Sequence, residues 1–242
     1  MDRDILSNLA HADHPIASPI SEENLSRLLR RARLPAGARA LDLGCGSAFW
    51  SLRLLELYGD ATAVGVDISD QGFAFARQEA ALRGVGDRLT LHHGSASGFD
   101  QAGPYDLVLC VGATHAFGGL AATMKSIGDL VVPGGLALVG EGFWERPPGA
   151  ELEDQIGTYR DLSGTVAEAE ASGFHTVYAH TSELGEWDDY EWSWTGSLID
   201  WALRNPGEDG EAARAAALAH REMWLDGYRD RLGFVTLLLR RV

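Results

Sequence analysis

Glycines and carboxylates follow two neighbouring apolar segments in a pattern typical of a nucleotide-binding turn. The run Ala40-Leu41-Asp42-Leu43 resembles a buried strand and passes directly into Gly44-Cys45-Gly46. Glycines at the carboxyl end of a strand let the backbone come close to a ligand. Asp67 ends the next apolar segment, about twenty residues further on, where a carboxylate can accept hydrogen bonds from both ribose hydroxyls of an adenosine group. The alternatives are an ordinary strand-to-helix turn and, for Asp67, a helix N-cap.

The chemistry around this turn favours a cationic ligand over a phosphorylated one. A dinucleotide-binding turn carries a third glycine, and Phe49 stands at that position here. Asp42, just before the turn, would repel a pyrophosphate and attract a cation. S-adenosylmethionine carries a sulfonium and an ammonium group and no phosphate. We therefore expect this cofactor rather than NAD.

The run 41–69, LDLGCGSAFWSLRLLELYGDATAVGVDIS, resembles the class I S-adenosylmethionine-dependent methyltransferases. Asp42 and the two glycines match the first motif of that family, Asp67 matches its ribose-binding acid, and Ala48 replaces a further glycine of the motif. The resemblance covers roughly residues 34–143. Within it, the run 87–99 is similar to the strand and loop at the adenine, and the run 105–119 to the segment beneath the methionine part. The resemblance implies cofactor contacts from Asp42, Gly44, Cys45, Gly46, Asp67, Ile68, Ser95, Ala96 and Val111.

The nearest subgroup by overall likeness is that of the quinone-biosynthesis enzymes, which methylate small molecules. It implies in-line transfer of a methyl group to a small acceptor, with S-adenosylhomocysteine as product. Two alternatives stay open: an RNA or protein methyltransferase, and a non-catalytic protein of the same fold that binds the cofactor. The formal net charge of −15 disfavours RNA, and Gly112-Ala113-Thr114-His115 stands where a base-methylating enzyme carries an Asn-Pro-Pro-aromatic motif.

Two residues that follow predicted strands are our candidates for a general base. His115 follows the fourth strand, and its imidazole has an ordinary pKa suited to proton transfer near neutral pH. Glu141 follows the fifth strand and is an alternative base, or a group that binds an acceptor ammonium. Both also have structural interpretations, as a loop histidine and a loop cap. The substrate pocket is expected to contain these two residues with Trp144 and Trp187 as aromatic walls.

Histidines are also found on a predicted N-terminal arm. His11 and His14 lie there, and in a methyltransferase of this kind the arm can fold over the cofactor, so either can reach the acceptor. A position on the surface is the simpler expectation. The Cys and His spacings offer no convergent set of metal ligands, so no metal site is expected.

Apolar segments alternate with helical patterns through the first two thirds of the chain. This alternation predicts a doubly wound, mostly parallel, Rossmann-like sheet, and the resemblance implies seven strands with an antiparallel last strand. The predicted strands are 38–43, 63–66, 88–92, 105–111, 136–140, 174–179 and 233–240. The predicted helices are one starting near Ser21 and those at 48–58, 71–83, 120–130, 167–171, 183–204 and 211–231.

We expect a single domain with four parts. Residues 1–33 form an arm and a helix over the cofactor site, 34–182 the cofactor-binding core, 183–232 a helical insertion, and 233–242 the terminal strand. Two cysteines and an acidic, polar N-terminus predict a cytoplasmic protein without disulfides. No apolar run approaches about 18 residues, so no membrane span is expected. The expected partner is a small-molecule acceptor, with no nucleic acid or membrane, and the expected state is a monomer or homodimer.

Overall fold

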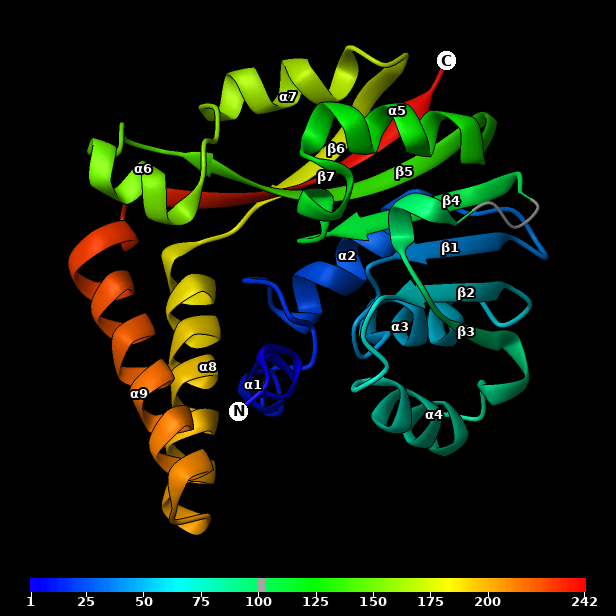
Figure 1. Ribbon diagram of the computed structural model, residues 1–242. Coiled ribbons are helices and arrows are strands. Elements are labelled where there is room, and N and C mark those ends of the chain that lie inside the picture. The colour runs from blue at the N-terminus through cyan, green and yellow to red at the C-terminus, as the bar shows by residue number, and fades with distance from the viewer. Residues whose placement is uncertain (100–102) are drawn as a thin grey trace.

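The computed structural model describes residues 1–99 and 103–242 and contains, within them, a seven-stranded sheet (Figure 1). The strand order is β3-β2-β1-β4-β5-β7-β6. The strands are β1 (Arg39–Leu43), β2 (Thr62–Asp67), β3 (Leu89–His93), β4 (Tyr105–Val111), β5 (Val131–Trp144), β6 (Phe174–Thr181) and β7 (Leu232–Arg241). The predicted fold class is confirmed.

The strand pairing identifies the carboxyl ends of β1 and β4 as the expected ligand-binding position. β1 is parallel to both β2 and β4, and the strand order reverses there. In open α/β sheets ligands bind outside the carboxyl ends of the strands at such a switch point. β7 is antiparallel to β5 and to β6, and its pairing with β5 runs from Leu136↔Arg240 to Trp144↔Leu232.

Helices cover both faces of the sheet and extend beyond one edge. α2 (Glu22–Ala32) and α3 (Phe49–Leu57) pack on one face, and α5 (Leu120–Leu130) and α7 (Leu162–Glu170) on the other. The apolar residues Leu25, Leu28 and Leu29 recur at helical spacing and are completely buried. The remaining α-helices are α1 (Arg3–Ala10), α4 (Phe73–Leu82), α6 (Ala150–Ile156), α8 (Leu184–Arg204) and α9 (Glu208–Glu222). Short turns of 3₁₀-helix are η1 (Gly86–Arg88), η2 (Ala96–Gly98) and η3 (Thr114–Phe117), and η4 (Met223–Tyr228) is a π-helix.

The helical insertion between the last two strands is present as expected. α8 and α9 pack as an antiparallel pair, and α1 lies between α8 and the ends of the central strands (Figure 1). We call α8, α9 and η4 the cap. Ala10 of α1 joins an apolar cluster with Leu198 and Ala213, which fixes the N-terminal helix to the cap.

Local details differ from the sequence-based expectations. β5 runs to Trp144 rather than ending at 140, so Glu141 and Trp144 lie within this strand and do not follow it. Residues 3–10 are helical rather than part of an irregular arm, because Asp2 caps the backbone amide of Asp4 and the apolar face of the helix packs on α8. The helix expected at 211–231 ends at Glu222 and continues as the π-helix. The helix expected at 167–171 begins at Leu162, because Asp161 caps it.

None of the helices among the described residues combines the length and the apolar character needed to cross a membrane.

Candidate functional site

The two glycines of the turn after β1 have different structural roles. Both have left-handed backbone, with φ of +76° at Gly44 and +52° at Gly46. A Cβ atom on Gly44 would lie 2.3 Å from Cβ of Ala113, so this position must be glycine for the turn to pack beside the end of β4. A Cβ atom on Gly46 would meet nothing within 4 Å. The backbone at Gly46 therefore borders open space of the kind that a ligand fills.

Ala48 has a left-handed backbone where the family motif has glycine. Its φ is +56°, and its side chain is buried in a cluster with Cys45 and Phe73. Alanine can adopt this conformation only at a cost of about 1–2 kcal/mol. The buried methyl contact offsets part of that cost, which explains how the turn keeps its shape with alanine in place of the motif's further glycine.

Asp67 holds the glycine turn in place. Its Oδ2 atom accepts a hydrogen bond from the Gly46 amide at 2.8 Å, and its Oδ1 atom accepts one from the Ser69 amide at 2.9 Å. The side chain is only half-buried, and a carboxylate has about four acceptor positions. Acceptor capacity therefore remains for two ribose hydroxyls beside the turn.

An apolar surface suited to a flat ring lies next to Asp67. Ile68 is 72% exposed, which is unusual for a large aliphatic side chain. Nε2 of His93 is hydrogen-bonded to the Ile68 carbonyl at 2.9 Å and fixes its backbone. Ser95 and Ala96, at the start of η2, follow the neighbouring strand β3. An exposed aliphatic side chain beside the carboxylate of Asp67 is compatible with a flat ring. That the adenine lies here stays a prediction, which this arrangement supports.

Asp42 is a buried acid beneath the turn. It is 4% exposed, and the Ser51 hydroxyl donates a hydrogen bond to its Oδ2 atom at 2.8 Å. Burial raises the pKa of Asp42 to about 7, and the Ser51 hydrogen bond opposes this rise. A cation bound beside the turn would favour the ionised form. Burial also raises the pKa of the Cys45 thiol, so Cys45 contributes packing rather than charge.

The N-terminal arm crosses over the glycine turn. The Ser47 hydroxyl donates a hydrogen bond to the Pro15 carbonyl at 2.6 Å. The Ala17 carbonyl oxygen lies 3.9 Å from the place of a Cβ atom on Gly112, just after Val111 and the end of β4. The resemblance places the methionine part of the cofactor at this strand end. That the arm covers the cofactor stays a prediction, which these two contacts support.

The predicted bases lie in different environments. His115 is exposed on η3, and η3 packs against η2, which lies on the expected adenine side. Glu141 is buried, and its carboxylate accepts hydrogen bonds from the Gly142 amide at 3.0 Å and from the Thr114 side chain. Burial raises the pKa of Glu141, and these hydrogen bonds oppose the rise. Glu141 therefore anchors the turn that carries His115. A catalytic role for either residue stays a prediction.

Trp144 and Trp187 belong to one aromatic group at the base of the cap. Trp144 packs with Trp224 and Tyr228, and the Trp187 ring lies 6.1 Å from that of Tyr228. A cavity of about 360 Å³ opens beside this group, lined by Trp187, Trp224, Tyr228 and their neighbours in β7 and the loop after β5. Its volume suits a small organic molecule. Phe234 connects the group to the strand ends, because its ring contacts Trp187 and lies where a Cβ atom on Gly140 would stand.

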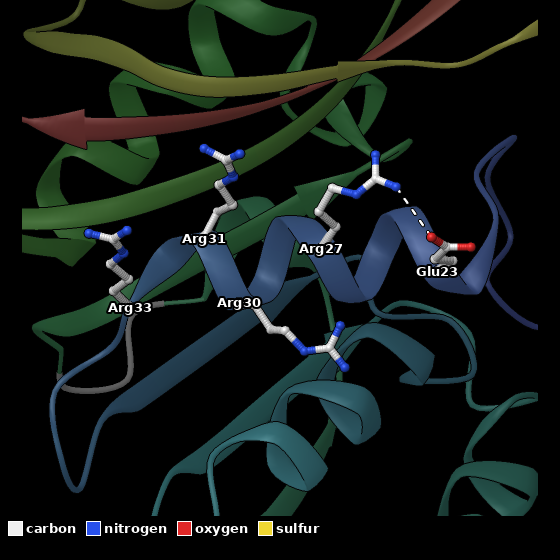
Figure 2. A pocket seen from close by; sticks show the side chains of 5 residues that line it. All are labelled: Glu23, Arg27, Arg30, Arg31 and Arg33. Carbon is white, nitrogen blue, oxygen red and sulfur yellow. Dashed lines mark hydrogen bonds and ion pairs between the residues drawn. The ribbon is translucent and has the colours of Figure 1, made fainter.

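A second hollow, of about 440 Å³, lies away from the strand-end crevice. It is lined by a glutamate and three arginines of α2 and by Arg33 at the C-cap of that helix. Figure 2 shows that Arg30 points to the side opposite to Arg27, Arg31 and Arg33. Arg27 is paired with Glu23 at 3.3 Å, and Arg31 lies over the Tyr178 ring. These side chains point in different directions and do not surround a common ligand position. We therefore do not include this hollow in the candidate functional site.

Sequence reasoning gave little weight to the arm histidines and did not connect Tyr190 to them. His11 Nε2 lies 3.1 Å from the Tyr190 hydroxyl, and the His14 ring meets the Tyr190 ring edge-on at 5.5 Å. His14 is 8% exposed rather than on the surface. The signal that could have found this group was the aromatic face of α8, on which Tyr190 follows Trp187 by three residues.

Comparison with known proteins agrees with the geometry. Residues 40–135 match the model of a methyltransferase domain. The chain is 30% identical over 224 residues to the Escherichia coli protein YjhP, covering 90% of each chain. It is 33% identical over 136 residues to the ubiquinone biosynthesis O-methyltransferase of Aromatoleum aromaticum, covering 53% of this chain and 56% of that one. An S-adenosylmethionine-dependent methyltransferase from Geobacter sulfurreducens, solved with S-adenosyl-L-homocysteine, superposes with a TM-score of 0.91 at 28% identity, covering 100% of this chain and 99% of that one.

Proposed function

Because the chain belongs to the class I S-adenosylmethionine-dependent methyltransferases, we propose that it methylates a small-molecule acceptor held between the strand ends, the N-terminal arm and the cap. The observation that carries this proposal is the arm, which contacts both the glycine turn and the end of β4 while packing on α8. An active site covered in this way admits small molecules more readily than a folded RNA or protein. The net charge of −15 supports the same conclusion against RNA.

The residues at the strand ends fit the cofactor. Asp67 would bind the ribose, Ile68 with Ser95 and Ala96 would border the adenine, and the backbone at Gly44, Cys45, Gly46 and Val111 would border the methionine part. S-adenosylmethionine supplies an electrophilic methyl group on a sulfonium. The buried Asp42 favours positive charge beside the turn. The chain's own contribution to the reaction is to hold the acceptor in line and to exclude water.

The likeness to quinone-biosynthesis enzymes supports the small-molecule class. The cavity of about 360 Å³ beside Trp187 has a suitable size, and it combines aromatic side chains with charged ones such as Glu183 and Arg229. Trp144 and Trp187 are proposed as aromatic walls of the acceptor site. His115 and Glu141, the other residues predicted for this pocket, lie on η3 and within β5.

Calorimetric titration tests the proposal in two steps. S-adenosylmethionine and S-adenosylhomocysteine are each expected to bind, whereas NAD is not. A screen of small-molecule acceptors with radiolabelled S-adenosylmethionine then measures methyl transfer, with unmodified transfer RNA and a ribosomal protein extract as the competing substrate classes. Transfer to RNA or protein alone would contradict the small-molecule proposal. Binding without transfer to any of the three classes would favour the non-catalytic alternative.

A further inference from the structure

His14 lies on the N-terminal arm and has a buried, polar side chain. It is 8% exposed, and its Nδ1 atom is buried and meets no hydrogen-bond partner among the described residues. Buried polar atoms without partners destabilise a fold, so such an atom calls for a ligand group. Nε1 of Trp187 is likewise buried without a partner among those residues, and Tyr190 packs between the two side chains.

The chain places His14 beside the reacting end of the site. The next residue, Pro15, accepts the hydrogen bond from Ser47 of the glycine turn, and Ala17 lies against Gly112 at the end of β4. Backbone hydrogen bonds from His14 to His11 and from Ala17 to His14 form successive turns that hold this segment of the arm. His115, by contrast, is exposed on a turn that packs on the adenine side.

We infer that His14 takes the proton from a hydroxyl group of a flat, ring-bearing acceptor that packs beside Tyr190 and Trp187. This inference rests on the proposed function, because it assumes methyl transfer at this site. In the reaction the acceptor O–H bond breaks and its proton moves to Nδ1 of His14. The oxygen electron pair forms the new bond to the methyl carbon, and the sulfur–methyl bond breaks with its electrons going to sulfur. The proton then leaves His14 to solvent.

The charges around His14 suit this role. Burial lowers the pKa of His14, while its own backbone and Asp189 oppose the shift, so the imidazole is neutral at neutral pH and able to accept a proton. Asp189 Oδ2 lies 3.9 Å from Nε2, on the opposite side of the ring, and stabilises the imidazolium that forms.

The other groups near His14 are already committed. His11 Nδ1 is bonded to the Ser7 carbonyl at 2.8 Å, so that nitrogen carries the proton and Nε2 accepts from the Tyr190 hydroxyl. His11 Nε2 is therefore occupied. Burial lowers the pKa of His11 too, and the nearby His14 and His220 act in the same direction. The hydrogen bond to the Ser7 carbonyl and the charge of Glu191 oppose the shift. Burial raises the pKa of Tyr190, so its hydroxyl stays protonated and is too weak a base to take a substrate proton.

The test compares acceptors of similar shape and different acidity. 4-Nitrocatechol ionises far more readily than 4-methylcatechol, so it depends less on a base. His14→Gln is expected to slow methylation of 4-methylcatechol about 100-fold or more and that of 4-nitrocatechol much less. The wild-type rate on 4-methylcatechol should rise with pH through the lowered pKa of His14 and then level off. In the variant it should rise only where the catechol itself ionises.

Three measurements keep the inference falsifiable. The affinity for S-adenosylhomocysteine should not change in His14→Gln, and His175→Gln, a matched change at an exposed histidine of β6, should leave all rates unchanged. His115→Gln should keep the wild-type ratio between the two catechols. Equal loss on both catechols in His14→Gln, or loss of S-adenosylhomocysteine binding, would show that His14 only fixes the arm and would overturn the inference.

Two further outcomes separate this inference from the proposed function. If the wild-type protein binds S-adenosylhomocysteine but methylates neither catechol, the hydroxyl-bearing acceptor class is wrong, while the methyltransferase proposal stands. If it binds neither S-adenosylmethionine nor S-adenosylhomocysteine, the proposed function fails and the inference fails with it.

Discussion

Asp67 combines two tasks in one carboxylate, and this makes it the sharpest point at which to test the cofactor site. It holds the amides of Gly46 and Ser69 and retains capacity for ribose hydroxyls. Asp67→Ala is expected to weaken S-adenosylhomocysteine binding by about 1–3 kcal/mol, because a charged acceptor is lost. Calorimetry measures the change. Asp70→Ala, at an exposed carboxylate three residues away, is the control and should bind normally. Unchanged affinity in Asp67→Ala would show that the ribose lies elsewhere.

The raised pKa of Asp42 predicts a dependence of stability on pH. The carboxyl ionises near pH 4 in the unfolded chain but only near pH 7 in the folded one, so its effect lowers the free energy of unfolding as pH rises between these values. Asp42→Asn removes this effect. Going from pH 5 to pH 8, the variant should gain stability relative to the wild type by on the order of 2–3 kcal/mol, at about 1.36 kcal/mol per pKa unit. Urea denaturation without ligand measures this, and the same pH response in both proteins would contradict the assignment.

The residues whose positions the sequence predicted are those in the turns directly after the strands. Asp42, Gly44, Gly46 and Asp67 lie together because the turns after two neighbouring parallel strands meet at one sheet edge. The environment of His14 was not predictable, because it depends on α8, which follows about 170 residues later in the chain. Pattern analysis has no means to determine which face of a helix an N-terminal arm will meet.

Among the elements, a buried hydrogen-bond network ties the cap together. Glu191 of α8 is 1% exposed, and its carboxylate is bonded to the Tyr228 hydroxyl at 2.5 Å and to His220 Nε2 at 2.7 Å. The His220 ring also stacks on Trp194. Tyr228 reaches Glu191 from the π-helix, and π-helical turns are frequent at functional sites.

This network predicts a specific loss of stability. Tyr228→Phe removes the hydroxyl and leaves an oxygen of Glu191 without its donor, so the free energy of unfolding should fall by about 1–3 kcal/mol. Chemical denaturation measures the change. Tyr178→Phe removes a hydroxyl from a half-buried tyrosine of β6 and should change stability by less than about 0.5 kcal/mol. Equal effects of the two substitutions would show that the network contributes nothing.

Element order was predictable because the strands are short apolar runs separated by turns. The π-helix was not, since its residues continue the helical pattern of α9 and only packing of Trp224 and Tyr228 at the base of the cap selects the wider turn. α6 was missed for a similar reason. It is short and has no buried residue, so no periodic apolar face marks it.

For the whole molecule, ligand binding should appear as thermal stabilisation. A ligand that binds only the folded state adds about 2.7 kcal/mol at 100 times its Kd. For a chain of 242 residues this corresponds to a rise in Tm of about 5–10 °C. S-adenosylhomocysteine is expected to produce such a rise in a thermal melt. NAD at the same concentration should not, because Asp42 lies beneath the turn where its pyrophosphate would bind. A rise with NAD alone would contradict the electrostatic argument.

The attachment of the cap has a consequence for how such proteins diversify. The cap leaves the sheet after β6 and returns to it at β7, and these two strands are direct neighbours, with Thr181 opposite Val235. A tight hairpin could join them without altering any other strand. The segment between those points can therefore be exchanged without changing the order of the strands, and a new cap must also supply the apolar contacts that hold α1. Recombination at this junction offers a route to new acceptors, and a chimera carrying another relative's cap is the natural starting point for engineering.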